Sequence, residues 1–159
     1  MEVIRGKTAM LFEASTHSAA ALAEATDEQR EALRTFGDHL GVAFQLVDDL
    51  LDYKGDSQTL GKNVGDDLAE GKPTLPLIYT MREGTAEQAA LVRQAIQKGG
   101  LEDLEQIRVA VEESGALKYT AELARDYVKR AIACLEVLPA SEYRDALVEL
   151  SEFAVARTH

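Results

Sequence analysis

Apolar side chains recur every three or four residues along almost the whole of this chain, a spacing that places them on one face of a helix. The clearest series consists of Leu33, Phe36, Leu40, Phe44, Val47 and Leu51. The alternation of β-branched and polar residues that is typical of strands is nearly absent. The pattern predicts an all-α fold, a helical bundle. A length of 159 residues, with 46% hydrophobic and 28% charged residues, suits one globular domain with a single core.

Local signals mark where the predicted helices begin and end. Thr26 and Thr85 each stand three residues before a glutamine, which is the spacing of a capping box. Pro73 and Pro76 suit the first turn of a helix, and Gly115 suits a helix end. The predicted helices cover residues 2–24, 27–53, a stretch that begins near Pro73, 86–97, 101–114, 116–137 and 141–157.

Composition excludes several classes of function. The chain has 28 acidic and 17 basic residues, and its net charge of −11 argues against binding to nucleic acid or to an anionic membrane surface. No apolar run reaches the roughly 20 residues that span a bilayer, so we expect no stable membrane insertion. Residues 1–7 do not resemble a signal peptide. Cys134, the single cysteine, fits a core position and a reducing compartment. We therefore predict a cytoplasmic protein.

Three carboxylates cluster at the end of the second predicted helix. Asp48 and Asp52 lie one turn apart on the same side, and Asp49 lies about 100° around the helix from Asp48. Clustered carboxylates suit a hard cation such as Mg²⁺, which makes Asp48, Asp49 and Asp52 the candidate metal ligands. The spacing does not fit an EF-hand, and the scattered histidines do not suit zinc. The alternative interpretation is an acidic helix end at the surface.

A glycine-rich segment follows this helix. Residues 54–72 lose helical periodicity and contain four glycines, which predicts a long ordered loop or a loop with a short helix. Lys62 and Lys72 adjoin glycines, so their ammonium groups can approach phosphate oxygens closely. Asp66 and Asp67 lie between them, and we expect capping or supporting roles for both in preference to direct metal binding.

Two stretches together resemble a known family. The run Gly41–Tyr53 reads GVAFQLVDDLLDY and is continued by Leu60–Lys62 and Gly71–Thr74. This run is similar to the second aspartate-rich region of trans-polyprenyl diphosphate synthases. Its residues most resemble those of bacterial octaprenyl and related long-chain synthases. The stretch Lys7–Ala14 resembles the helix that precedes that region in the same family. The similarity in layout covers essentially the whole chain.

The resemblance implies a prenyltransferase of isoprenoid biosynthesis, which elongates an allylic diphosphate with isopentenyl diphosphate and requires Mg²⁺. It implies that Asp48 and Asp49 are the main metal ligands, with Asp52 third and acting through water, and that Lys62 takes part with Asp48 and Asp49 in catalysis. The residues expected to face the allylic diphosphate are Lys7, Thr8, Gln45, Lys62 and Lys72.

Ordinary structural roles are the alternatives for several of these residues. Lys7 is then a solvated lysine, Thr8 a hydroxyl on a helix face, and Gln45 a hydrogen-bonding partner inside the bundle. Aromatic and methionine side chains at helical spacing either line a prenyl tunnel or belong to the core, and we favour the core. The residues in question are Met10, Phe12, Phe36 and Phe44.

The resemblance further implies that residues 1–159 are the carboxyl-terminal half of a synthase. The first aspartate-rich motif of the family, and its basic pocket for isopentenyl diphosphate, have no counterpart here. We expect the isolated chain to be inactive, to form a homo-oligomer, and to need the amino-terminal half or a second subunit. The alternatives are a noncatalytic diphosphate-binding or regulatory subunit of a split synthase, and an unrelated helical domain. A class I terpene cyclase fits less well, because the lysine-containing loop and the Lys7–Thr8 pair are typical of synthases.

Overall fold

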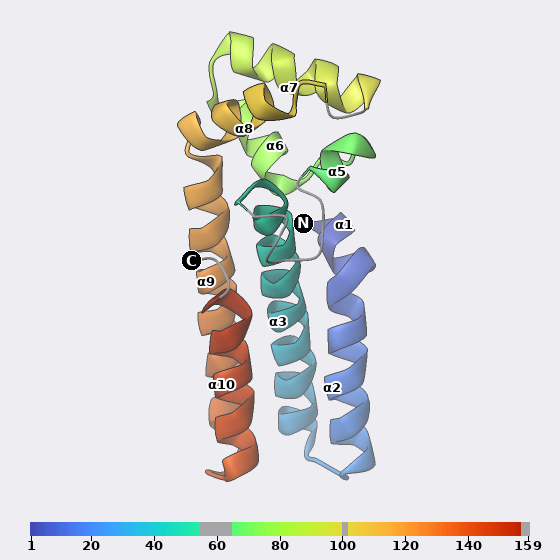
Figure 1. The fold of residues 1–159 in the computed structure, drawn as a ribbon. Helices are drawn as coiled ribbons and strands as arrows, with labels where there is room; N and C mark the ends of the chain where they lie inside the picture. Colours follow the sequence, from blue (N-terminus) through green and yellow to red (C-terminus); the bar gives the residue numbers. More distant parts are fainter. Residues whose placement is uncertain (55–64, 100–101, 157–159) are drawn as a thin grey trace. The chain divides into compact units, whose positions relative to one another are not determined.

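The computed structural model describes residues 1–54, 65–99 and 102–156. Every regular element within those ranges is helical, so the predicted all-α fold is confirmed. The chain divides into two compact units, of which the first consists of Met1–Val47 and Glu122–His159 and the second of Asp48–Ala121. The long helices α3 (Asp27–Lys54) and α9 (Ala116–Cys134) contribute residues to both units (Figure 1).

The first unit is a bundle whose long helices run side by side (Figure 1). Besides parts of α3 and α9, its elements are α1 (Glu2–Ile4), the π-helix η1 (Arg5–Ala9), α2 (Met10–Leu22), the 3-10 helix η2 (Leu135–Val137) and α10 (Glu142–Ala156). Apolar side chains from α3, α9, η2 and α10 meet in its core. These core residues are Phe36, Leu40, Ala131, Leu135 and Ala154.

Two glycines allow α3 to lie very close to η1 and α2. A Cβ atom added at Gly37 would lie 2.4 Å from Thr16 Oγ1, and one added at Gly41 would lie 2.6 Å from the Cα atom of Ala9. Thr16 Oγ1 donates a hydrogen bond across this contact to the carbonyl oxygen of Leu33, 2.7 Å away. The contact therefore depends on the absence of side chains at these two positions of α3.

The start of the chain differs from the sequence prediction. One regular helix was expected over residues 2–24, whereas the structure has the π-helical turn η1 between α1 and α2, and α2 ends at Leu22. Two contacts with α3 stabilise this wider turn. Arg5 Nε lies 3.0 Å from Asp38 Oδ1, and Thr8 Oγ1 donates a hydrogen bond of 2.6 Å to Gln45 Oε1. π-helical turns of this kind frequently occur at functional sites.

Among its described residues, the second unit contains four shorter helices together with the end of α3 and the start of α9. These helices are α5 (Asp66–Ala69), α6 (Leu75–Glu83), α7 (Ala86–Lys98) and α8 (Leu104–Glu113). Its core consists of Tyr53, Leu68, Leu77, Val92, Ala95, Ile107, Val111 and Ala116. Of the two predictions for the glycine-rich segment, a loop with a short helix agrees with the described residues, since α5 lies there.

The predicted capping boxes are both formed. The Gln29 N–H donates to Thr26 Oγ1 at 3.3 Å while the Thr26 N–H donates to Gln29 Oε1 at 3.1 Å, at the start of α3. Thr85 and Gln88 make the same reciprocal pair at the start of α7. These side chains satisfy backbone N–H groups that have no partner within the helix, which fixes where each helix begins.

Two further predictions concern Cys134 and membranes. Cys134 is a free, partly buried thiol that packs against the core of the first unit and donates a hydrogen bond to the Arg130 carbonyl oxygen at 3.3 Å. Burial raises the pKa of this thiol, so the less reactive protonated form is favoured. Throughout the described ranges, no helix combines the length and the apolar character needed to cross a membrane.

Candidate diphosphate and metal site

The three aspartates of the sequence motif lie near the end of α3, in the second unit. Asp49 is only 4% exposed, whereas Asp48 and Asp52 are partly exposed. Their neighbours Leu50 and Tyr53 are buried, so this part of α3 is anchored in a core and is not an isolated solvated helix end. The interpretation of the motif as a freely solvated acidic helix end is therefore wrong for Asp49.

Asp52 is bonded to the segment that begins α5. Its main-chain carbonyl oxygen accepts a hydrogen bond from the Gly65 N–H at 3.0 Å, and its Oδ2 atom accepts one from the Asp67 N–H at 3.3 Å. Gly65 has a φ of 87°, a conformation that glycine adopts readily and that other residues adopt at a cost. The sequence therefore permits a tight turn that brings two backbone donors to Asp52.

The carboxyl groups of Asp52 and Asp67 repel each other. The pKa of Asp52 is raised to about 6, mainly by burial and secondly by the negative charge of Asp67. A nearby cation would lower the energy of such a carboxylate pair. Perturbed acids of this kind are often found at functional sites, although structural networks perturb them too.

Lys72 supplies a positive charge next to this acidic pair. Its Nζ atom lies 3.1 Å from Asp67 Oδ1 and 2.7 Å from Glu70 Oε2. Hydrogen bonds with Glu70 and then with Asp67 raise the pKa of Lys72, so the ammonium group is charged at neutral pH. The structure thus brings together Asp52, Asp67 and Lys72. The contacts of Asp67 with Asp52 and Lys72 agree with the supporting role that the sequence predicted for it.

The first unit holds a second group of predicted residues. Thr8 Oγ1 and Gln45 Oε1 are hydrogen-bonded at 2.6 Å, and Gln45 is buried. Lys7 precedes Thr8 in the π-helical turn η1, and it is exposed. Thr8 and Gln45, which were both expected to face the allylic diphosphate, are therefore direct hydrogen-bonding partners, and their role toward the diphosphate stays a prediction. This hydrogen bond also agrees with the alternative in which Gln45 forms hydrogen bonds inside the bundle.

Lys62, which was predicted to contact the diphosphate and to take part in catalysis, lies outside the described residues. Within the described residues, no three histidine, cysteine or acidic side chains form a group that could hold a metal ion. Mg²⁺ does not need such a cage, because it usually keeps several waters and binds one or two carboxylates together with phosphate oxygens. The oxygen donors at the end of α3 fit that kind of ion, and the roles of Asp48, Asp49 and Asp52 as ligands stay predictions.

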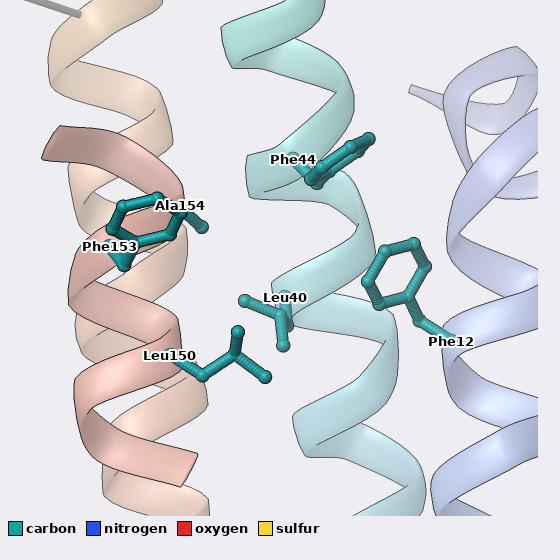
Figure 2. Close-up of a pocket in the computed structure, with 6 residues that line it drawn as sticks. All are labelled: Phe12, Leu40, Phe44, Leu150, Phe153 and Ala154. Carbon is teal, nitrogen blue, oxygen red and sulfur yellow. The ribbon is translucent and has the colours of Figure 1, made fainter. Parts of the chain in front are cut away.

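An apolar pocket opens in the first unit, with a volume of about 200 Å³ (Figure 2). Phe12 comes from α2 and Phe44 from α3, with ring centroids 5.5 Å apart. Figure 2 shows the opposite wall, which α10 forms with Leu150 and Phe153.

The four candidate tunnel residues therefore lie in three different kinds of environment. Phe36 belongs to the core, as expected, whereas Met10 is exposed and Phe12 and Phe44 line the pocket. A tunnel role for these residues stays a prediction. The sequence did not predict that α10 lines this pocket. A helical pattern identifies the apolar face of a helix, but not the element against which that face packs.

Known proteins are similar to this chain over its whole length. The family model described as Polyprenyl synthetase matches residues 1–114. An octaprenyl diphosphate synthase from Haemophilus influenzae is 49% identical over 100% of this chain and 49% of that protein. An all-trans-nonaprenyl-diphosphate synthase (geranyl-diphosphate specific) from Rhodobacter capsulatus is 51% identical over 99% of this chain and 48% of that protein.

Solved structures of polyprenyl synthases are also similar to this chain. A polyprenyl synthase from Caulobacter crescentus CB15, crystallised with calcium and isoprenyl diphosphate, matches with a TM-score of 0.91 and 44% identity, over 99% of this chain and 49% of that one. The chain thus spans about half the length of the relatives that it matches. The family model covers the aspartates of α3, Asp67 on α5, and Lys72. The resemblance inferred from the sequence is confirmed, and this chain belongs to the polyprenyl synthetase family.

Proposed function

We propose that this chain supplies the magnesium- and diphosphate-binding part of a polyprenyl diphosphate synthase. The reaction is the elongation of an allylic diphosphate with isopentenyl diphosphate. The observation that carries the proposal is the hydrogen-bonded arrangement of Asp52, Asp67 and Lys72 in a chain of this family. The Caulobacter relative was crystallised with calcium and isoprenyl diphosphate, which supports a role for a divalent cation.

The residues of the chain have distinct tasks in this proposal. Asp48, Asp49 and Asp52 bind Mg²⁺, which when bound neutralises charge on the departing diphosphate. Lys72 donates hydrogen bonds to phosphate oxygens, and Asp67 holds both Lys72 and Asp52 in place. Stabilising the negative charge that develops on the leaving group lowers the barrier to its departure.

The π-helical turn η1 belongs to the first unit and carries donors of its own. Lys7, Thr8 and Gln45 bind the allylic diphosphate in this proposal, together with Lys62. Thr8 donates to Gln45 Oε1, which turns the amide nitrogen of Gln45 away from Thr8. The resulting site recognises the diphosphate through hydrogen bonds and charge, while apolar side chains such as Phe12 and Phe44 shield the prenyl chain from water.

We also propose that the chain corresponds to the carboxyl-terminal half of the synthase and acts in the cytoplasm with the amino-terminal half or a second subunit. The support is its span of about half of its relatives and the single Asp-Asp-x-x-Asp motif in its sequence. The isolated chain should not elongate prenyl chains. Product formed by this chain alone from an allylic diphosphate, isopentenyl diphosphate and Mg²⁺ would contradict this part of the proposal.

Calorimetric titration with inorganic pyrophosphate tests the binding function directly. We expect binding to require Mg²⁺, and Asp52→Asn or Lys72→Gln to weaken it by at least about tenfold, as expected for loss of a charged contact. Lys98→Gln removes a lysine that pairs with Glu102 at the end of α7 and serves as the control. Binding without Mg²⁺, or equal binding by all three variants, would refute the proposal.

Mixing the chain with a separately produced amino-terminal half distinguishes a catalytic half of a synthase from a noncatalytic subunit. Product formation by the mixture supports a catalytic half. Intact magnesium-dependent binding without product would favour the alternative, a noncatalytic diphosphate-binding or regulatory subunit of a split synthase.

A further inference from the structure

A buried pair of hydroxyl groups links α3 to the segment that follows Lys72. The Tyr53 hydroxyl and Thr74 Oγ1 are 3.2 Å apart, and their residues are 2% and 8% exposed. Tyr53 follows Asp52 in α3, and Thr74 stands two residues after Lys72. The pair therefore joins the residue after a candidate metal ligand to a residue two positions from a candidate phosphate-binding lysine.

Main-chain hydrogen bonds connect the same places by a second route. The Gly65 N–H donates to the Asp52 carbonyl oxygen at 3.0 Å, and the Asp67 N–H donates to the Asp52 carboxylate at 3.3 Å. The Lys72 N–H donates to the Asp67 carbonyl oxygen at 2.9 Å, and the Thr74 N–H donates to the Lys72 carbonyl oxygen at 3.0 Å. The hydroxyl pair closes this series into a ring that begins and ends at adjacent residues of α3.

The ring is also attached to α8. Arg108 Nε donates a hydrogen bond to the carbonyl oxygen of Tyr53 at 3.3 Å. This carbonyl group belongs to the last turn of α3, where backbone oxygens lack partners within the helix. Tyr53 is therefore fixed by its ring in the core, by its hydroxyl group and by its carbonyl group.

We propose that Tyr53 and Thr74 are positioning residues, whose hydroxyl pair holds Asp52 and Lys72 in the register that binds a diphosphate with Mg²⁺. The inference rests on the function proposed above. Both hydroxyl groups are buried, so they act through Asp52 and Lys72 and do not touch the ligand. Without the pair, residues 65–74 keep their main-chain bonds and the packing of Leu68 in the core, but lose the buried hydrogen bond that joins Thr74 to α3.

The test uses variants that remove one hydroxyl group and keep the side-chain shape. Tyr53→Phe and Thr74→Val each delete one member of the pair, whereas Thr74→Ser retains it. Tyr143→Phe is the matched control, because Tyr143 is 77% exposed on α10. Circular dichroism first shows that all four variants are folded.

Amide hydrogen exchange, followed by NMR without ligand, gives the first readout. We expect the Gly65 and Asp67 amides to exchange about fivefold faster in Tyr53→Phe and Thr74→Val, the factor that fits one lost hydrogen bond. Thr74→Ser and Tyr143→Phe should match the parent. Unchanged exchange at these two amides, or equal acceleration at amides throughout the second unit, would overturn the proposal, since a merely structural role affects the whole core.

Magnesium-dependent binding of pyrophosphate gives the second readout, and we expect about fivefold weaker binding by the same two variants. Faster exchange with unchanged affinity would also overturn the proposal, because the register would then not matter for the ligand. If the parent chain binds no pyrophosphate, the proposed function fails, while the exchange rates still decide whether the hydroxyl pair fixes the register.

Discussion

The negative charge on Asp52 destabilises the folded chain at neutral pH. Its pKa is raised to about 6 by burial and by Asp67, whereas an aspartate in an unfolded chain has a pKa of about 3.9. Between these two values the folded chain keeps a proton that the unfolded chain has released. Stability therefore falls as the pH rises from about 4 to about 6, and it stays lower above that range.

Asp52→Asn should raise stability at pH 7, because asparagine removes the charge and keeps an oxygen acceptor for the Asp67 N–H. Solvent screens this partly exposed group, so we expect a gain of about 1 kcal/mol, or about 2–4 °C in Tm. At pH 4 the difference should largely disappear, since Asp52 is then protonated in the folded parent. Thermal unfolding at both pH values checks this, and an equal difference at both would contradict it.

The hydrogen bond between Thr8 and Gln45 gives a second prediction. Thr8→Val removes the donor to Gln45 Oε1, and Gln45 is buried, so the change should lower the free energy of unfolding by about 1 kcal/mol. Thr8→Ser keeps a hydroxyl group and is the control. Urea denaturation measures both variants. If the valine variant is as stable as the serine variant, this hydrogen bond does not stabilise the fold.

Among the elements, the close contact of α3 with η1 depends on Gly41. Gly41→Ala would place a Cβ atom 2.6 Å from the Cα atom of Ala9, so the backbone must move. We expect a loss of about 1–3 kcal/mol, as for other overpacked sites. Gly6→Ala is the matched control, because a Cβ atom at Gly6 meets nothing within 4 Å. It should leave Tm unchanged or raise it, since alanine favours helix. Equal Tm values for the two variants would contradict this account.

The same elements show what sequence patterns can predict. The starts of two helices were predicted correctly from Thr26 and Thr85, because a capping box involves residues only three positions apart. The π-helical turn at Arg5–Ala9 was not predicted. Its contacts with Asp38 and Gln45 join residues more than thirty positions apart, and periodicity within one helix contains no information about such partners.

In the molecule as a whole, the candidate site follows the same rule: its local features were predictable from the sequence, and its long-range contacts were not. The placement of Asp48, Asp49 and Asp52 near one helix end follows from local spacing, and the structure agrees. The hydrogen bond from Asp67 to Asp52 joins two segments that the helical pattern treats separately. The wall that α10 adds to the apolar pocket is likewise a long-range contact. The sequence therefore predicted most of the helices and the residue types of the site, but not which of these residues contact one another.

The apolar pocket of the first unit leads to the prediction of self-association. Leu150 and Phe153 line the pocket and are 52% and 63% exposed, in a chain that spans about half the length of its relatives. Exposed apolar surface of this kind favours association. We expect the parent chain to form concentration-dependent oligomers in sedimentation velocity experiments. A double variant with Leu150→Lys and Phe153→Lys should shift it toward monomer without loss of helical content, because both side chains are already half exposed.

Tyr143→Lys controls for the added charge, since Tyr143 is more exposed on the same helix and does not line the pocket. It should associate like the parent. A parent chain that stays monomeric at all concentrations would show that the pocket does not bind a second copy. Equal association of the parent and the double variant would place the contact elsewhere on the chain. A shift in the double variant alone would assign the contact to the pocket, because charge added elsewhere on α10 would then have no effect.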